Sequence, residues 1–167
     1  MHYALYFVPH ELEREKLALL RRQLCKRFEN RKAVMYPVHL TLVRELSFRD
    51  YKAFMRALER HCAAQKPFRI KLAARLATRE SWGGVEVERS QALTRLQEGL
   101  VALCAAQGEV VPSAFDPHIS LVYAKRLPSL AGRTSPVKHV DVDRVSLVLQ
   151  TAPGTPFRIV KHIPFGN

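Results

Sequence analysis

The sequence contains one short pattern twice, as Val38-His39-Leu40-Thr41-Leu42 and as Pro117-His118-Ile119-Ser120-Leu121. Each copy has a histidine, then an apolar residue, then a hydroxyl residue, with apolar neighbours around them. Such a run favours a β-strand, in which successive side chains point to opposite faces. The histidine and the hydroxyl residue of each copy therefore share one face, and the apolar residues share the other.

The repetition itself points to function. One histidine two residues before a threonine is most often a partly exposed side chain beside an ordinary strand-forming residue. Two copies with the same apolar surroundings, each after an amphipathic segment and a proline, are hard to obtain from packing alone, since packing would accept Val or Thr at both histidines. We therefore interpret His39, Thr41, His118 and Ser120 as one site.

Two imidazoles and two hydroxyls suit an in-line displacement at a phosphodiester. A neutral imidazole can take a proton from water while a protonated one donates to the leaving ribose oxygen, and histidine titrates near neutrality. The hydroxyls of Thr41 and Ser120 can bind the non-bridging phosphate oxygens. The sequence leaves open whether His39 or His118 is the acid. It shows no carboxylate cluster for magnesium and no Cys/His set for zinc, so we expect neither a metal nor a cofactor.

At these residues the chain resembles the two-histidine (2H) phosphoesterase superfamily. The run Phe115-Asp116-Pro117-His118-Ile119-Ser120-Leu121-Val122-Tyr123 is similar to the second motif of its cyclic phosphodiesterase branch, and the RNA 2′,5′-ligase-like proteins belong to the same superfamily. The resemblance implies a bilobed α+β fold, with two pseudo-symmetric antiparallel sheets forming a cleft and helices on the outside. It also implies a phosphoric diester hydrolase that opens the 2′,3′-cyclic phosphate of a nucleotide or RNA end and leaves a 2′-phosphate, or that acts on an ADP-ribose cyclic phosphate.

Two other functions stay open at this point. The reverse reaction, RNA 2′,5′-ligation, would use the same two histidines. A binding module could recognise nucleotides or RNA ends without turnover, but such a module would have no reason to keep both His39 and His118.

The remaining sequence supports an α+β fold in one domain, residues 1–167. Apolar residues recur at helical spacing over three segments, and alternating or β-branched runs predict strands between them. We expect helices at 10–29, 47–65 and 91–106. We expect strands at 3–8, 38–43, 68–77, 85–87, 118–123, 142–149 and 157–163.

Four further residues are candidates for the cleft. Trp82 stands beside Gly83 and Gly84 in a predicted turn, where it could stack on a base or cap the edge of the core. Tyr3 and Tyr6 lie on opposite faces of the first strand, so at most one of them should line the cleft. Tyr123 follows the second motif, and alternation turns it toward the core unless the strand bends. Arg44 ends the strand of the first motif and could neutralise phosphate or lie on the surface.

The composition favours a phosphate-rich partner. The chain has 167 residues with 27 Lys and Arg against 15 Asp and Glu, which gives a net charge of +12. The three cysteines match no metal-ligand spacing, which is typical of buried thiols in a reducing compartment. No apolar run is long enough to span a bilayer. We expect a cytoplasmic monomer that binds a nucleotide or RNA carrying a cyclic phosphate and does not bind membranes.

Overall fold

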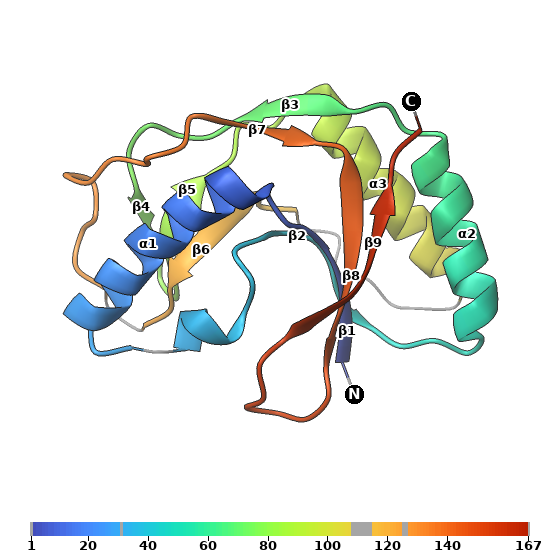
Figure 1. Ribbon diagram of the computed structural model, residues 1–167, viewed down its shortest axis with the longest axis horizontal. Coiled ribbons are helices and arrows are strands. Elements are labelled where there is room, and N and C mark those ends of the chain that lie inside the picture. The colour runs from blue at the N-terminus through green and yellow to red at the C-terminus, as the bar shows by residue number, and fades with distance from the viewer. Residues whose placement is uncertain (1, 31, 108–114, 125–126, 167) are drawn as a thin grey trace.

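The computed structural model of the chain describes residues 2–30, 32–107, 115–124 and 127–166. Within these ranges there are three α-helices, one short 3₁₀-helix and nine strands (Figure 1). They are β1 (His2–Phe7), α1 (Glu11–Arg27), η1 (Lys32–Met35), β2 (Leu40–Leu46), α2 (Tyr51–Ala63), β3 (Phe68–Lys71), β4 (Ala77–Thr78), β5 (Gly83–Glu86), α3 (Gln91–Ala106), β6 (His118–Val122), β7 (His139–Val142), β8 (Arg144–Gln150) and β9 (Arg158–Pro164). Among the helices described, none has both the length and the apolar character that crossing a membrane requires.

Seven strands form one antiparallel sheet in the order β4-β5-β6-β2-β1-β8-β9, and β3 pairs with β7 in a separate two-stranded sheet. The large sheet has two halves that meet at a single pair of residues, Leu40 in β2 and Ile119 in β6. Strands β4 to β6 lie on one side of this junction, and β2, β1, β8 and β9 lie on the other (Figure 1). The expected bilobed α+β architecture is confirmed, and its two sheets are these two halves.

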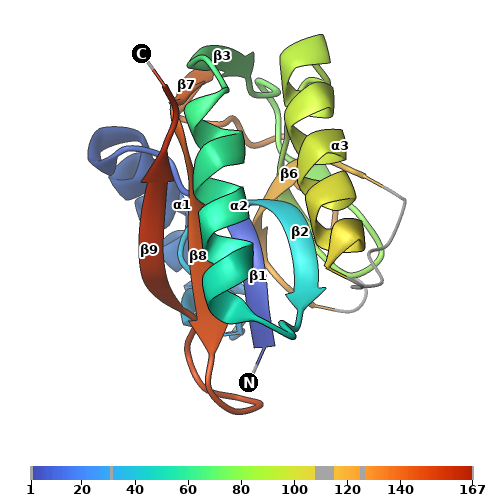
Figure 2. The same cartoon turned by 90° about the vertical axis from the view of Figure 1, so that its right-hand side faces the viewer.

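Each half of the sheet is covered by a helix that follows a strand of the other half. Helix α1 follows β1 but packs against β6, whereas α3 follows β5 but packs against β2. Helix α2 packs against β9 and lies beside α3 (Figure 2). This exchange joins the two lobes through a shared core, in which Leu40 and Ile119 are fully buried. The core side of the motif strands is thereby fixed, and their histidines lie on the other side of the strands.

The helices begin where the sequence supplies a capping side chain. The carboxylate of Asp50 accepts a hydrogen bond from the Ala53 N–H (2.9 Å) at the start of α2, and the Ser90 hydroxyl accepts one from the Leu93 N–H (3.2 Å) at the start of α3. Such caps satisfy backbone donors that the first helical turn leaves free. Helix α3 has the predicted bounds, while α2 starts later than expected because Asp50 ends the preceding extended segment.

Two of the expected strands are divided. The predicted strand at 68–77 changes partner along its length, because β3 pairs with β7 while β4 pairs with β5. The segment before β8 forms β7, which belongs to the smaller sheet. Alternation of apolar residues predicts that a strand exists, but it carries no information about where the strand leaves one neighbour for another.

Strand β2 contains an irregularity just beyond the first motif. Its pairing with β1 shifts register twice between Thr41 and Leu46, and Glu45 has a left-handed φ of 53°. Leu42 and Val43 are both buried, so the alternation of faces is interrupted there. A register shift of this kind means that one strand has an extra residue relative to its partner, which changes the direction of the side chains that follow.

Strand β5 approaches β6 at a position that admits only glycine. A Cβ added to Gly84 would lie 2.1 Å from the carbonyl oxygen of Ile119 and 3.0 Å from the backbone nitrogen of Leu121. The register of the two strands also shifts between Gly83 and Gly84. The close approach therefore places the β5 backbone directly beside the second motif.

Candidate active site

The four motif side chains meet at the junction of the two half-sheets. Leu40 pairs with Ile119 in an antiparallel register. Continuing this register by one residue in each direction sets His39 opposite Ser120 and Thr41 opposite His118. Since neighbours on one strand alternate between faces, these four residues share the face away from the core. The structure thus brings together the four residues that the sequence predicted as one site.

Both imidazoles are held by the same type of hydrogen bond. The Nδ1–H of His39 donates to the carbonyl oxygen of Pro37 (2.7 Å), and the Nδ1–H of His118 donates to that of Asp116 (2.8 Å). A carbonyl oxygen can only accept, so Nδ1 must carry the proton in each ring. The Nε2 atom of each histidine remains for chemistry, and its basicity is set by its surroundings.

Each imidazole also lies against an aromatic ring. The ring of Tyr6 in β1 stacks on His39 with centroids 3.7 Å apart and planes 16° apart. The indole of Trp82, just before β5, stacks on His118 at 3.9 Å and 6°. Both aromatic side chains are buried, Tyr6 with 5% and Trp82 with 8% of its surface exposed. The hydrogen bond and the stacked ring together fix the orientation of each imidazole.

The surroundings of His39 favour its neutral form. Burial lowers the pKa of His39 to about 4, although the hydrogen bond to Pro37 acts in the opposite direction. Positive charge on His118 and on Arg44 lowers this pKa further. The effect of one imidazole on the other shows that the two rings lie within electrostatic range in the same site.

His118 has different neighbours. Burial lowers its pKa as well, but the carbonyl and the carboxylate of Asp116 oppose this shift. The Asp116 carboxylate lies 3.8 Å from Nδ1 of His118, and Glu86 also favours the charged ring. A negative group near an imidazole stabilises the imidazolium form. The two histidines are therefore geometrically similar but electrostatically different.

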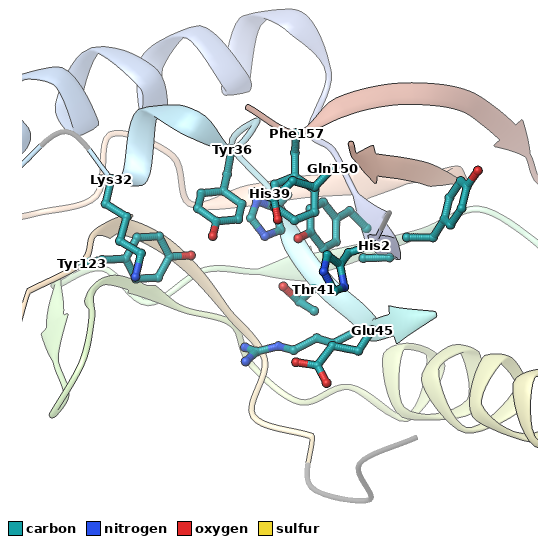
Figure 3. Close-up of a pocket in the computed structure, with 13 residues that line it drawn as sticks. His2, Lys32, Tyr36, His39, Thr41, Glu45, Tyr123, Gln150 and Phe157 are labelled. Carbon is teal, nitrogen blue, oxygen red and sulfur yellow. The ribbon is translucent and has the colours of Figure 1, made fainter. Parts of the chain in front are cut away.

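The cleft consists of two adjoining pockets, each of about 370 Å³. We call them the His39 pocket and the His118 pocket after the histidine that each contains. Thr41, Arg44 and Tyr123 line both, so the two pockets meet at these side chains. Figure 3 shows Thr41, Tyr36, Tyr123 and Phe157 gathered around His39 in the first pocket.

Arg44 reaches this boundary because β2 is irregular. Strict alternation from Thr41 would turn Arg44 to the core with Leu42. The interruption at Leu42 and Val43 instead places Arg44 on the cleft side, where its side chain is exposed. The guanidinium charge affects both His39 and His118. Of the two outcomes considered for Arg44, the structure supports the position in the cleft.

Tyr123 lies in the cleft, not in the core as alternation would predict. Strand β6 ends at Val122, so alternation no longer applies to the next residue. The side chain of Asn30 donates a hydrogen bond to the Tyr123 carbonyl oxygen, which holds the backbone there. The Tyr123 hydroxyl hydrogen-bonds to the side chain of Ser120, which is 8% exposed.

Trp82 does not form an open surface on which a base could stack. One face of its indole lies on His118, and the side chain is buried, so it offers little free surface to a base. Tyr6 is likewise covered, by His39 and by the more distant ring of Phe157 (6.1 Å). Both rings contact the histidines directly and serve to position them.

Several residues around the cleft were not predicted from the sequence. Tyr36 and Phe157 stack on each other at 4.8 Å in the His39 pocket, and Arg21 of α1 donates to the Tyr36 carbonyl oxygen (2.7 Å). These contacts join segments that are distant in the sequence, so no local sequence pattern predicts them. Gln97 lines the His118 pocket, and it did have a signal, because it interrupts the apolar stripe of its helix.

The exchanged lobes and the paired histidine strands define the class of the two-histidine phosphoesterases. A family model described as the 2′-5′ RNA ligase superfamily matches residues 8–153, and the chain belongs to that superfamily. Among curated protein sequences, none matches the chain.

Solved structures show the same fold over nearly the whole chain. The structure of TT0787 of Thermus thermophilus is 20% identical with a TM-score of 0.71, and the match covers 98% of this chain and 97% of that one. E. coli LigT in complex with 3′-AMP is 18% identical with a TM-score of 0.75, over 99% and 98% of the two chains. Usb1 of Kluyveromyces marxianus is 12% identical with a TM-score of 0.51, over 98% and 97%.

Proposed function

We propose that this protein opens cyclic phosphodiesters, and that its substrate is the 2′,3′-cyclic phosphate of a nucleotide or RNA end. The observation that carries this proposal is the pair of imidazoles in one cleft, each with Nδ1 bonded to a carbonyl and Nε2 left for proton transfer. One ring can then take a proton from the attacking water while the other donates to the leaving oxygen. The product is a 2′-phosphate, and the leaving group is the ribose 3′-oxygen.

The charges around the two rings favour a different role for each. His39 is buried near cationic groups, and no carboxylate of the described residues is among the groups that influence its charge, so it acts as the neutral base that takes the proton from water. His118 has the carboxylate of Asp116 at 3.8 Å, so it is the acid that protonates the leaving oxygen. A base and an acid with different surroundings can be in their reactive forms at the same pH.

The phosphate occupies the boundary between the two pockets, where Thr41, Arg44 and Tyr123 meet. The Thr41 hydroxyl and the Arg44 guanidinium can donate hydrogen bonds to the non-bridging oxygens, where negative charge grows in the transition state. Ser120 takes part from the opposite strand, and its hydroxyl is oriented by the bond to Tyr123. No step in this scheme requires a metal ion.

The comparisons support a nucleotide as the ligand. Structures of E. coli LigT have been solved with 3′-AMP, with ATP, with NADP⁺ and with phosphate. All of these ligands carry phosphate, and three of the four contain a nucleotide. The net charge of +12 also favours phosphate-bearing substrates.

Ligation in the 2′,5′ direction is the second candidate. It is favoured by the presence of two pockets of equal volume on either side of the phosphate position, since a linear diester joins two nucleosides whereas a cyclic phosphate carries one. In ligation the base would take the proton from the 5′-hydroxyl of a second RNA instead of from water, and the acid would protonate the same leaving 3′-oxygen.

The test is a screen of purified protein in the presence of EDTA. The substrates are the four nucleoside 2′,3′-cyclic phosphates, an RNA with a cyclic phosphate end, and that RNA together with a second RNA that has a free 5′-hydroxyl. Hydrolysis to 2′-phosphates is the expected result. Joined 2′,5′-linked RNA without hydrolysis would favour the ligase, and activity that is lost in EDTA and restored by zinc or magnesium would contradict the mechanism.

A further inference from the structure

Helix α3 carries one buried polar side chain that faces the cleft. The buried residues of this helix are Leu93, Leu96, Gln97, Leu100 and Cys104. Gln97 has 7% of its surface exposed and lines the His118 pocket. Within the described part of the chain, its amide makes no hydrogen bond. The amide is not among the described buried polar atoms that lack a partner, so it is open to the pocket, where water or a ligand can form hydrogen bonds to it.

The pocket around Gln97 has both apolar and polar walls. Phe115 lines it together with Trp82, whose indole lies on His118. Polar and charged groups come from Thr41, Arg44, Ser81, Asp116 and His118. A nucleoside, which has a flat base with hydrogen-bonding groups at its edge and a polar ribose, can use both kinds of wall.

The roles of the two histidines determine which part of the substrate enters this pocket. The acid must be next to the leaving oxygen, and that oxygen belongs to the ribose that stays attached to the phosphate after cyclic-ester opening. The ribose and its base therefore lie on the side of His118, whereas the water attacks from the side of His39.

We propose that Gln97 is a specificity-determining residue that hydrogen-bonds to the edge of the substrate's nucleobase in the His118 pocket. This inference rests on the proposed function. A glutamine amide presents a donor and an acceptor side by side, which is the arrangement that pairs with the edge of a base. A base that matches the amide is bound better than one that does not, so the protein distinguishes among the four bases.

The experiment compares kcat/KM for the four nucleoside 2′,3′-cyclic phosphates and for a base-free ribose 2,3-cyclic phosphate. The proteins are the wild type, Gln97→Leu and the control Gln91→Leu, which changes an exposed residue at the start of the same helix. Leucine fills the volume of the glutamine without its hydrogen bonds. Because the position is buried among apolar residues, Gln97→Leu should melt at the wild-type temperature or above it.

The wild type should prefer one base, and Gln97→Leu should reduce that preference by about 10-fold or more, mainly through KM. The rate on the base-free substrate should be unchanged, and Gln91→Leu should match the wild type throughout. An equal loss on all substrates, including the base-free one, would place the amide on the ribose or phosphate and overturn the inference. Unchanged discrimination in Gln97→Leu would overturn it too. If His118→Ala nevertheless lost activity, the inference about Gln97 would fail while the proposed function would still hold.

Discussion

At the scale of single residues, the two histidines are alike in geometry and different in charge. The hydrogen bond from Nδ1 to a carbonyl two residues earlier is the same in both, with lengths of 2.7 and 2.8 Å. Arg44 opposes charge on both rings, but the carboxylates of Asp116 and Glu86 favour charge on His118, whereas His118 itself opposes charge on His39. This difference is what separates a base from an acid when both are the same residue type.

The pH dependence of kcat/KM should show this difference. His39 must be neutral, and with a pKa of about 4 it is neutral above roughly pH 5. The value of kcat/KM should therefore rise with pH up to roughly pH 5. His118 must be protonated, and because its pKa is lowered below 6.5, activity falls before pH 6.5 is reached. The profile should be a bell on the acidic side of neutrality.

The variant Asp116→Asn tests the assignment. Removing the carboxylate lowers the pKa of His118 further, so the falling limb should move to lower pH, the rising limb should stay, and the maximum should not increase. Suppose that His118 were the base instead. Lowering its pKa would then raise the fraction of molecules in the reactive protonation state, so a faster maximum in this variant would reverse the roles.

The four motif residues could be predicted from the sequence because they depend only on strand alternation, which is local. The stacking of Tyr6 and Trp82 on the histidines could not be predicted in this way. These two rings reach the histidines through the pairing of β1 with β2 and of β5 with β6, which is not local. Alternation was also misleading for Tyr123, because it assumes a strand that continues past Val122.

At the scale of elements, the site depends on how closely the strands approach. Arg44 enters the cleft only because β2 is irregular, and the β5 backbone lies beside the second motif only because Gly84 has no side chain. The sequence indicated a turn at Gly83 and Gly84, but the need for glycine in the strand itself comes from the neighbouring backbone. Helix α3, with a regular apolar stripe and a serine cap, was predicted with its observed bounds.

Gly84→Ala should damage both stability and activity. The new Cβ would meet the Ile119 carbonyl at 2.1 Å, and backbone atoms cannot rotate away, so β5 must separate from β6. We expect a loss of about 1 to 3 kcal/mol in the free energy of unfolding and a fall in kcat/KM, because Ser120 and His118 are on the displaced strand. The measurements are chemical denaturation and steady-state kinetics.

Gly132→Ala is the matched control, since nothing lies within 4 Å of the Cβ that it would add. It should leave stability and kcat/KM close to those of the wild type. If Gly84→Ala behaved like this control, the close approach of β5 to the motif strand would not be a requirement of the site.

At the scale of the whole molecule, the exchanged packing of α1 and α3 ties the two lobes into one core and leaves the cleft face for chemistry. The arrangement of helices and strands could be predicted in outline, but the joining of the half-sheets at Leu40 and Ile119 could not. One consequence is that His39, on the cleft side of this junction, is buried even though it is a catalytic candidate.

Burial of a neutral His39 should make the folded state sensitive to acid. Its pKa falls from about 6.5 in an unfolded chain to about 4 in the fold, so the unfolded chain binds more protons between these values. The free energy of unfolding should therefore decrease as the pH drops from 6.5 to 4, by up to about 3 kcal/mol from this residue. Above pH 6.5 its contribution should be constant.

Melting temperatures measured between pH 4 and 8 check this expectation. The lowered pKa values of His61, His118 and His162 act in the same direction, so the wild type should lose stability steadily below pH 6.5. His39→Gln removes one titrating group and should show a weaker dependence on pH. The same slope in both proteins would mean that folding does not lower the pKa of His39.

The central claim is that His39 and His118 act together on a phosphodiester, and their alanine variants test it. Each replacement removes a proton transfer and should lower kcat/KM by about 10² to 10⁴. Thr41→Ala and Ser120→Ala should lose less, because each removes one neutral hydrogen bond to phosphate.

The most direct measurement is kcat/KM on a nucleoside 2′,3′-cyclic phosphate, in EDTA, for the wild type, His39→Ala, His118→Ala and the double variant, with thermal melts to show that each is folded. Hydrolysis by the wild type, a loss of about 10² to 10⁴ in each single variant, and a double variant hardly slower than either are the predicted results, because groups that act as a unit are not additive. Turnover near the wild-type rate by folded His118→Ala would contradict the paired-histidine mechanism.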